Sequence, residues 1–520
     1  MNPDIDKTLA ELIEESFDKY CHKPAFSCFG QTLNFKEIEV KSRALAVWLQ
    51  QDSGLQAGDR VAIQLPNLIQ YPIIAYAIIR AGMVVVNTNP MYTQREMAHQ
   101  FKDSGAKAIF IVQSILPSLA NILGQTQIDK VIEVGLTDLI TGTTIVNNPH
   151  HEGFSQLIER YQDKALAPRN APSDTLILQY TCATTGPSKG AELTDSNLIS
   201  QCHQVLERLG DSYKEGQEIF VAPLPLYHIY AFSMYLLVSA LEGNLGVLIP
   251  DPRNMDALVE AIKPFKFTVF SGINTLLVGL CQHPGFLSLD FSKLKLTASG
   301  GAALTSSAAN LWMAVTGCTV TEGYGLSETS GALTINKPGQ EEVGTVGEPL
   351  FDTVIEIRND ENVTLPDGQE GEIVAKGPQV MKGYYNKPEA TTSVIDAEGW
   401  FATGDIGEID RDGFLYITDR KKDLIVTGGG KNVAPQPIEN RLKTNVFVEQ
   451  AVIIGDRRPY LVLLIVPATE PLQQWASQNG VEWSSFEELV SNQEVLSHLE
   501  REILGELSDL ASFETPKKIA

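Results

Sequence analysis

Two kinds of hydrophobic pattern alternate along the first part of the chain. Apolar residues recur at helical spacing in some segments and form short continuous runs in the segments between them. The pattern predicts helices over 34–50, 69–82 and 94–105, and strands over 59–65, 83–89 and 106–112. Asn34 is placed to cap the first of these helices, and Gly82 is placed to end the second. This alternation is typical of an α/β fold with doubly wound parallel sheets.

The pattern changes over residues 341–418. Short runs rich in strand-forming residues alternate there with turn signals such as Asp367-Gly368 and Asp412-Gly413. We expect this segment to form a small β subdomain. From about residue 440 onward, strands are followed by helices rich in Glu, Gln and Ser, which predicts a small α+β domain in the last part of the chain.

Length and charge limit the classes of function. The chain has 520 residues, of which 43% are hydrophobic and 20% charged, and these values fit a globular protein of several domains. Its formal net charge is -24, and nucleic acids and anionic membranes repel a polyanion. We therefore expect no nucleic-acid partner. An anionic substrate such as ATP would need nearby basic groups or Mg²⁺ to offset this charge.

The sequence also indicates a cellular compartment. The six cysteines are scattered, and none forms a C-x-x-C pair or has zinc-site spacing, which favours reduced thiols. The N-terminal residues are acidic and helical in pattern, unlike a signal peptide. Polar residues interrupt the most apolar stretches, 61–86 and 231–250, so we predict no membrane span. We expect a cytoplasmic protein.

The stretch 180–190, YTCATTGPSKG, is the strongest candidate for chemistry. An apolar run over 175–178 leads into it and a helical pattern follows it, so the sequence predicts strand, loop and helix, with Asp195 or Ser196 as the helix cap. Such a loop offers backbone N–H groups, three threonine hydroxyls and the Lys189 ammonium to a polyphosphate. A polar surface turn is the alternative. The loop is not a P-loop, because Lys189 is followed by Gly.

Three later stretches are further candidates. PLPLYHIYAF (223–232) places His228 among aromatic residues, either as a core histidine or as a polar group of a site. KLKLTASGGAAL (293–304) is a strand that runs into small residues, which either let a flat base approach the backbone or form a tight junction. TEGYGLSETS (321–330) places Glu328 after a Tyr-Gly pair.

These stretches, in this order and with GWFATGD (399–405) and DRKKD (419–423) after them, resemble the motifs of the adenylate-forming superfamily. The segment VNTNPMYTQREMAHQFKDSGAKAIF is similar to bacterial fatty-acyl-CoA synthetases. The phosphate loop departs from the usual wording at Cys182, Ala183 and Pro187-Ser188. If the position of Ala183 needs a positive φ, its β-carbon strains the loop and weakens ATP binding; otherwise the change costs little.

The resemblance implies roles for individual residues. It places His228 and Phe232 at the acyl group, Glu328 on Mg²⁺, and Gly429 and Gly430 beside the arm of coenzyme A. A carboxylate prefers a hard cation, and it also accepts hydrogen bonds from ribose hydroxyls. Catalytic roles are implied for Lys189, His228, Glu328 and Lys422. ATP binding is implied for Thr181, Thr184, Thr185, Gly186, Lys189, Gly301, Ala302, Tyr324, Gly325, Thr329, Asp405 and Arg420.

The resemblance also implies a domain organisation. We expect an N-terminal domain over 1–420, which includes the β subdomain, and a mobile C-terminal lid over 421–520 with Lys422 at the hinge. Members of the family continue to a lysine that stabilises the adenylation transition state, and no position here matches it. We therefore expect the lid to lack its last segment. The hypothesis is that this chain adenylates poorly but still transfers an acyl group from acyl-AMP.

The expected function is ATP-dependent activation of a medium- to long-chain fatty acid to acyl-AMP, followed by transfer to coenzyme A. Three alternatives stay open: an acyl-AMP ligase that loads a carrier protein, an aryl-CoA ligase, and a catalytically impaired nucleotide- or acyl-binding homologue. ATP, Mg²⁺, coenzyme A and the fatty acid are the expected ligands. A homodimer and peripheral contact with the inner membrane are left open by the sequence.

Overall fold

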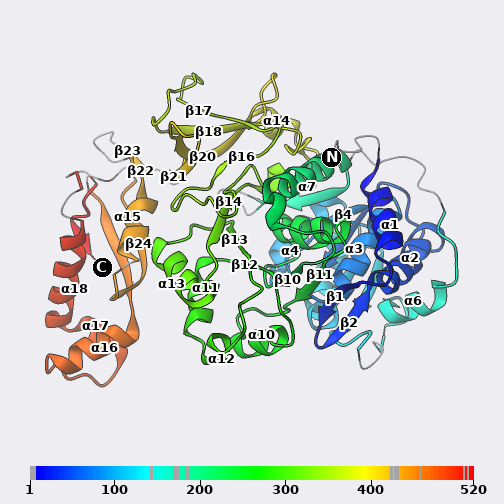
Figure 1. Ribbon diagram of the computed structural model, residues 1–520, viewed down its shortest axis with the longest axis horizontal. Helices are drawn as coiled ribbons and strands as arrows, with labels where there is room; N and C mark the ends of the chain where they lie inside the picture. Colours follow the sequence, from blue (N-terminus) through cyan, green and yellow to red (C-terminus); the bar gives the residue numbers. More distant parts are fainter. Residues whose placement is uncertain are drawn as a thin grey trace. The chain divides into compact units, whose positions relative to one another are not determined.

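The structure is a computed structural model, and it describes residues 7–519 except 141–144, 147, 168–174, 182–186, 422–424, 427–431, 444, 457, 459, 508–509 and 512–513. The chain forms two compact units, and Figure 1 labels their helices and strands. The first unit contains Met1–Ile355 and Ala375–Phe401, and the second contains Glu356–Val374 and Ala402–Ala520. Much of the β-rich segment thus belongs to the second unit. The expected boundary at residue 420 stays a prediction.

The larger sheet of the first unit has nine strands in the order β16-β15-β14-β13-β12-β10-β11-β1-β2. The run from β14 to β1 is parallel, and the outer strands at both ends are antiparallel. The strands are β1 (Pro24–Cys28), β2 (Gln31–Asn34), β10 (Ile219–Ala222), β11 (Leu245–Leu248), β12 (Val269–Gly272), β13 (Leu296–Gly300), β14 (Val320–Tyr324), β15 (Thr334–Ile335) and β16 (Glu348–Pro349).

The second sheet of this unit has eight strands in the order β19-β9-β8-β4-β3-β5-β6-β7. From β8 to β7 it is parallel, and β9 and β19 are added in antiparallel pairing. The strands are β3 (Arg60–Gln64), β4 (Val84–Asn87), β5 (Ala108–Val112), β6 (Lys130–Val134), β7 (Glu152–Gly153), β8 (Ile177–Tyr180), β9 (Gly190–Leu193) and β19 (Gly383–Tyr384). The predicted α/β class with doubly wound sheets is confirmed.

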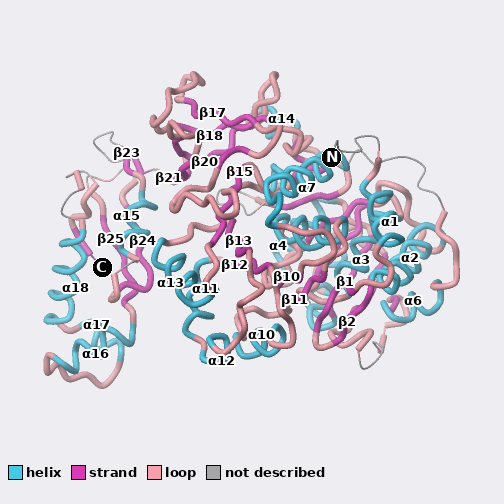
Figure 2. The backbone as a smooth tube through the Cα atoms, in the orientation of Figure 1, coloured by secondary structure: helices cyan, strands magenta, loops and turns pink. Residues whose placement is uncertain are grey.

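Helices join and cover these sheets (Figure 2). The α-helices of the first unit are α1 (Leu9–Lys19), α2 (Phe35–Gln51), α3 (Gln70–Arg80), α4 (Gln94–Ser104), α5 (Leu116–Ala120), α6 (Phe154–Tyr161), α7 (Asp195–Leu209), α8 (Ile229–Ala231), α9 (Ser239–Leu241), α10 (Met255–Ile262), α11 (Asn274–Gln282), α12 (Pro284–Leu287), α13 (Ser306–Thr316) and α14 (Pro388–Thr392). Short helices of other types are η1 (Gln113–Ile115), η2 (Leu123–Gln125), η3 (Gly210–Ser212), the π-helix η4 (Phe232–Val238) and η5 (Ser327–Thr329).

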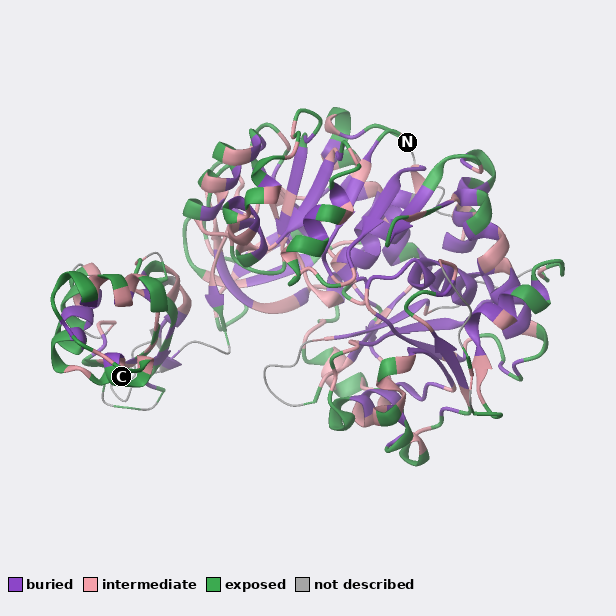
Figure 3. Ribbon diagram, turned by 90° about the horizontal axis from the view of Figure 1, so that it is seen from below, coloured by how far each residue is buried: buried purple, intermediate pink, exposed green. Residues whose placement is uncertain are grey.

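Helix α3 is buried on all sides, as its largely apolar sequence requires. Its one charged residue, Arg80, is paired with Glu14 at 2.6 Å and with Glu39 at 3.1 Å, so the guanidinium is not left unpaired in the interior. Among the described residues, no helix is long and apolar enough to cross a membrane. The strands of both large sheets are mostly buried (Figure 3).

The second unit contains most of a four-stranded sheet and a small α+β body. The body has a core formed by residues such as Leu442, Leu463, Leu472 and Ile503. The strands are β17 (Val354–Arg358), β18 (Gly371–Lys376), β20 (Phe401–Ile409), β21 (Leu415–Arg420), β22 (Ile425–Val426), β23 (Asn432–Val433), β24 (Val448–Ile454), β25 (Val462–Pro467) and β26 (Lys518–Ile519), and the helices are α15 (Pro435–Leu442), α16 (Thr469–Gln478), α17 (Phe486–Ser491) and α18 (Gln493–Glu506). The predicted small α+β domain is confirmed.

Three local predictions were wrong. The stretch 180–190 does not lead directly into a helix: it connects β8 to the antiparallel strand β9, and α7 begins only afterwards. The cap of α7 is Thr194, whose hydroxyl accepts from the backbone N–H of Asn197, and not Asp195 or Ser196. Two short strands of the β-rich segment also pair elsewhere, because β16 joins the nine-stranded sheet and β19 joins the eight-stranded one.

The turn after β14 requires glycine at position 325. A β-carbon on Gly325 would lie 2.1 Å from the carbonyl oxygen of Gly331 and 2.6 Å from Cα of Ala332. Both contacts are with backbone, which cannot move aside as a flexible side chain can. The turn carries η5 and therefore fixes where Glu328 lies.

We predict that Gly325→Ala lowers the free energy of unfolding by about 1–3 kcal/mol, the usual cost of forcing an atom into a packed site. Urea titration would measure it. Gly124→Ala is the matched control, because a β-carbon at Gly124 meets nothing within 4 Å; its effect should stay within about 0.5 kcal/mol. Equal stability of the two variants would contradict the assignment.

Candidate active site

The parallel strands of the nine-stranded sheet bring separate motifs to one edge. His228 follows β10, Gly301 and Ala302 follow β13, and Tyr324 is the last residue of β14. These three strands run parallel through β12, so their carboxyl ends meet at the same edge. Ligands of open α/β sheets bind at such an edge. The predicted residues of three motifs therefore lie together at the expected place.

The segment predicted to approach adenine, Gly301 and Ala302, has free space beside its backbone at Gly301. Gly301 has a φ of +78°, which favours glycine, and a β-carbon there would meet no atom within 4 Å. Ala302 is exposed, whereas Tyr324 is buried with 9% of its surface accessible. Gly300 and Gly323 face each other closely, since a β-carbon on Gly300 would lie 3.1 Å from the Gly323 carbonyl oxygen. The small residues thus keep β13 and β14 in contact at their ends.

The base of the phosphate loop is held as a hairpin. The N–H of Thr181 donates to the carbonyl of Lys189 at 3.0 Å, and Tyr180 pairs with Gly190 in the adjoining strands. The tip of the loop lies outside the described residues. The predictions for Cys182, Ala183, Thr184, Thr185 and Gly186 therefore stay predictions.

Side chains from α4 and from the segment after β19 anchor this hairpin. Asp103 accepts a hydrogen bond from the Tyr180 hydroxyl at 2.9 Å and forms an ion pair with Lys387. Burial and the nearby Asp103 carboxylate raise the pKa of Tyr180, so its hydroxyl stays protonated and donates. His99 Nε2 lies 2.9 Å from the carbonyl oxygen of Ser188. Contacts at Tyr180 and at Ser188, on the two sides of the loop, thus fix the position of Lys189.

The side chains of Lys189 and Glu328 both contact Tyr384. The Lys189 ammonium lies over the ring of Tyr384, 4.3 Å from its centroid. The Tyr384 hydroxyl donates to Oε1 of Glu328 at 2.7 Å. Burial, followed by the charge of Glu328, raises the pKa of Tyr384, so the hydroxyl remains a donor. A cation and an anion from two separate motifs are therefore held on the same phenol group.

The turn that carries Glu328 is tightly bonded. The carbonyl of Glu328 accepts from the N–H of Met381 at 2.7 Å. The Thr329 side chain is fully buried, and its hydroxyl accepts from the N–H of Leu326 at 2.9 Å. Within the part of the chain that the structure describes, no three His, Cys, Asp or Glu residues gather as metal ligands. A single carboxylate fits Mg²⁺ that takes its other ligands from phosphates and water.

His228 and Phe232 occupy different surroundings. His228 is accessible, yet enough protein surrounds its ring that desolvation lowers its pKa below the usual 6.5. The ring lies 5.3 Å from that of Tyr227. Phe232 is fully buried at the start of the π-helix η4, whose residues all belong to the core. Of the two predicted acyl contacts, only His228 reaches solvent in this structure.

The second unit contains the predicted ribose residues. Asp405 on β20 is paired with Arg420 on β21, and Arg420 Nε lies 3.3 Å from Asp405 Oδ1. Asp405 is buried with 4% of its surface accessible. Lys422, Gly429 and Gly430 lie outside the described residues, so their predicted roles stay predictions.

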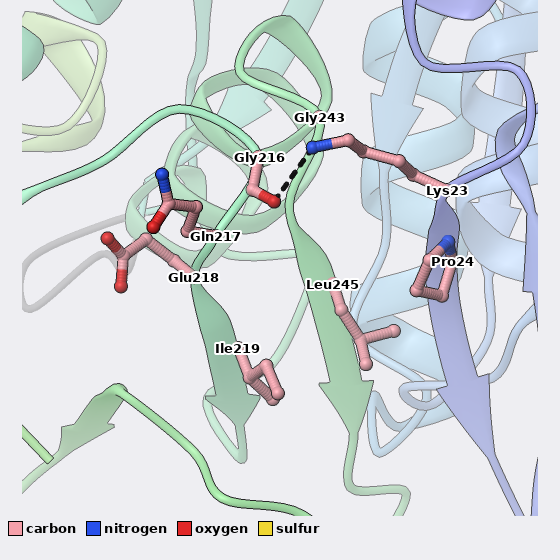
Figure 4. A pocket seen from close by; sticks show the side chains of 8 residues that line it. All are labelled: Lys23, Pro24, Gly216, Gln217, Glu218, Ile219, Gly243 and Leu245. Carbon is pink, nitrogen blue, oxygen red and sulfur yellow. Dashed lines mark hydrogen bonds between the residues drawn. The ribbon is translucent and has the colours of Figure 1, made fainter. Parts of the chain in front are cut away.

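A cavity of about 250 Å³ lies away from these residues (Figure 4). It opens at the amino ends of β10, β11 and β1, opposite to the edge that carries the motifs. The Lys23 ammonium donates to the Gly216 carbonyl at 2.9 Å on its rim. The lining residues are Lys23, Pro24, Gly216, Gln217, Glu218, Ile219, Gly243 and Leu245. Its place at the amino ends argues against an active site.

Sequence reasoning missed the residues that connect the motifs. Tyr384 lies in the β-rich segment 341–418, where the sequence predicts only strands and turns. His99 and Asp103 lie in the predicted helix over 94–105, to which the sequence assigns no site residue. No spacing rule joins residue 384 to residues 189 and 328, because the contact depends on β19 pairing with β9. An aromatic residue in a short, isolated strand segment was the one available signal.

Comparisons with known proteins agree with this geometry. A sequence profile described as AMP-binding enzyme matches residues 13–385, and one described as AMP-binding enzyme C-terminal domain matches residues 422–518. A long-chain-fatty-acid--CoA ligase of Escherichia coli is 38% identical over 473 residues, covering 88% of this chain and 84% of that protein. The Bacillus subtilis protein of the same name is 34% identical, covering 86% and 83%.

Solved structures show the same fold. The crystal structure of ATP-bound MatB from Rhodopseudomonas palustris is similar with a TM-score of 0.79 and 27% identity, covering 98% of this chain and 94% of that one. The resemblance predicted from the motifs is confirmed. The chain belongs to the AMP-binding enzymes of the adenylate-forming superfamily, and it is an acid–thiol ligase.

Proposed function

We propose that this protein is a fatty acid–CoA ligase that acts on a medium- to long-chain fatty acid with ATP and coenzyme A. One observation carries the proposal: Lys189 and Glu328, from separate motifs, are held on one tyrosine in the unit that carries the AMP-binding profile. The 38% identity to proteins named long-chain-fatty-acid--CoA ligase supports the choice of acid.

The reaction has two steps. A carboxylate oxygen of the fatty acid attacks the α-phosphorus of ATP, and the bond from that phosphorus to the bridging oxygen of pyrophosphate breaks. The thiol of coenzyme A then loses its proton and attacks the acyl carbon, and AMP leaves as the carbon–oxygen bond breaks. No side chain forms a covalent intermediate. The protein must therefore orient the reactants and neutralise phosphate charge.

We assign the neutralisation of phosphate charge to the hairpin loop and to Mg²⁺ held by Glu328. Lys189 and the hydroxyls of Thr181, Thr184 and Thr185 would bind phosphate oxygens, with the backbone of Gly186 beside them. Glu328 would hold Mg²⁺, which when bound withdraws charge from the phosphates. Thr329 is assigned to ATP by its motif, but its hydroxyl is bonded to Leu326, so we expect it to stabilise the turn as well.

The remaining roles follow the motifs. Gly301, Ala302, Tyr324 and Gly325 would form the adenine side, and Asp405 and Arg420 would contact the ribose. His228 would hold the fatty-acid carboxylate for attack, and Phe232 would close the acyl site. Lys422 would be the hinge of the lid, and Gly429 and Gly430 would let the arm of coenzyme A pass. A cytoplasmic location, a homodimer and peripheral contact with the inner membrane stay predictions of the sequence.

The first test is pyrophosphate release with Mg·ATP and acids from acetate to oleate, with benzoate added, beside coenzyme A consumption from synthetic acyl-AMP. We expect release to peak with a medium- or long-chain acid. A peak with benzoate would favour an aryl-CoA ligase, and acyl-AMP formed without coenzyme A use would favour carrier loading. Consumption without release would mean that only adenylation is impaired. Absence of activity in both assays would contradict the proposed ligase function.

We predict that Glu328→Gln lowers the rate of pyrophosphate release about 10²–10³-fold, because it removes the charge proposed to hold Mg²⁺. Transfer from preformed acyl-AMP should change much less, because no pyrophosphate leaves in that step. Glu389→Gln, at an exposed position of α14, is the control and should behave as wild type. Equal losses in both half-reactions would argue for a structural role of Glu328.

His228 gives a prediction for pH. Desolvation lowers its pKa below the usual 6.5, so the neutral ring predominates at pH 7 and protonation is shifted to lower pH. A protonated ring would bind the carboxylate more tightly and make it a poorer nucleophile. Pyrophosphate release by the wild type should therefore fall more steeply from pH 7 to pH 5.5 than release by His228→Gln. Parallel pH profiles would exclude His228 from carboxylate binding.

A further inference from the structure

We propose that Tyr384 is a positioning residue that keeps Lys189 and Glu328 from pairing with each other before ATP binds. This inference rests on the proposed function, because it concerns the two charges assigned to the phosphates and Mg²⁺. It adds a role for a residue that none of the motifs assigns.

The backbone fixes Tyr384 between the two charges. Strand β19 pairs with β9, and Tyr384 lies opposite Ala191, two residues after Lys189. The N–H of Tyr385 donates to the Gly190 carbonyl at 2.8 Å, and the N–H of Met381 donates to the Glu328 carbonyl at 2.7 Å. The segment 381–385 is thus bonded to the phosphate hairpin on one side and to the turn of Glu328 on the other.

The side chain of Tyr384 satisfies each charge separately. Its ring contacts the Lys189 ammonium, and its hydroxyl donates to the Glu328 carboxylate. Within the described part of the chain, the Lys189 ammonium contacts the Tyr384 ring and forms no ion pair with a carboxylate. Tyr384 and Glu328 are both buried, with 7% and 8% of their surfaces accessible. Opposite charges attract strongly in buried surroundings. If a smaller side chain replaced Tyr384, the Lys189 ammonium and the Glu328 carboxylate could form an ion pair.

A direct Lys189–Glu328 pair would oppose ligand binding. Each charge would neutralise the other, and ATP would have to break the pair before it could use the lysine. A cation over an aromatic ring is a weaker and less directional contact, which a phosphate can replace at low cost.

Ordinary core packing is the competing explanation, since Tyr384 also belongs to the main hydrophobic cluster of the first unit. The two explanations differ in one respect. A packing role makes the effect of removing Tyr384 independent of the charge on Glu328. A separating role makes the effect depend on that charge.

A double-mutant cycle tests the difference. ATP binding is measured by calorimetry in EDTA for the wild type, Tyr384→Leu, Glu328→Gln and the double variant. We expect Tyr384→Leu to weaken Mg-free ATP binding about tenfold, a coupling usual for neighbouring charged side chains. Glu328→Gln should then restore most of that affinity in the Leu background, and the gain should be about tenfold larger than in the wild type.

Two further variants keep the test decisive. Tyr384→Phe keeps the ring between the two charges but removes the donor to Glu328, so its affinity for Mg-free ATP should fall by less than in Tyr384→Leu. Tyr385→Leu makes the same change at the next residue, whose ring lies against Arg60, and should leave the affinity unchanged. Thermal unfolding identifies any variant that fails to fold. If Tyr384→Leu fails, the cycle with Glu328→Gln is repeated with Tyr384→Met, whose flexible side chain fills more of the space.

The outcomes separate this inference from the proposed function. An equal gain from Glu328→Gln in both backgrounds, or a loss in Tyr384→Phe as large as in Tyr384→Leu, would overturn the role of Tyr384 while acyl-CoA formation by the wild type stands. A wild type that binds no ATP and forms no acyl-CoA would overturn the proposed function itself.

Discussion

The pairing of β9 on both edges is the constraint on which the candidate site depends. Strand β8 holds one edge of β9, and β19 holds the other. The pairing with β8 closes the phosphate loop into a hairpin and fixes the position of Lys189 at its end. The pairing with β19 brings the 381–385 segment from far along the chain to the same place. The turn of Glu328 is then bonded to this segment, so one strand of four residues aligns three parts of the site.

A second layer of contacts prevents the hairpin from shifting. Asp103 binds both Tyr180 and Lys387, which come from the two sides of β9, and His99 holds the carbonyl beside Lys189. These contacts come from α4, in a segment to which the sequence assigns no site residue. The chain as a whole carries a charge of -24, yet the hairpin carries the Lys189 ammonium, and the nearby Asp103 carboxylate is paired with Lys387. The local arrangement therefore allows a polyanionic ligand that the net charge disfavours.

The sequence predicted what depends on local pattern. The helix over 34–50 with Asn34 as its cap, the strands over 59–65, 83–89 and 106–112, and the α/β class all agree with the structure because period and capping act within a few residues. The prediction of a helix directly after the phosphate loop was wrong, because the four-residue strand β9 lies between them. Its sequence, GAEL, has no strong strand pattern. Tyr384 could not be predicted, because its role arises from pairing between strands nearly two hundred residues apart.

The path of the chain between the two units has a consequence for any attempt to divide the protein. Residues 375–401 return to the first unit after an excursion into the second. A fragment that stops at residue 355 would contain every motif of the first unit but would lack β19. Strand β9 would then become an open edge beside the phosphate hairpin, and an unpaired edge recruits other chains. The first unit is therefore a single body in space but not a segment that can be cut out of the sequence.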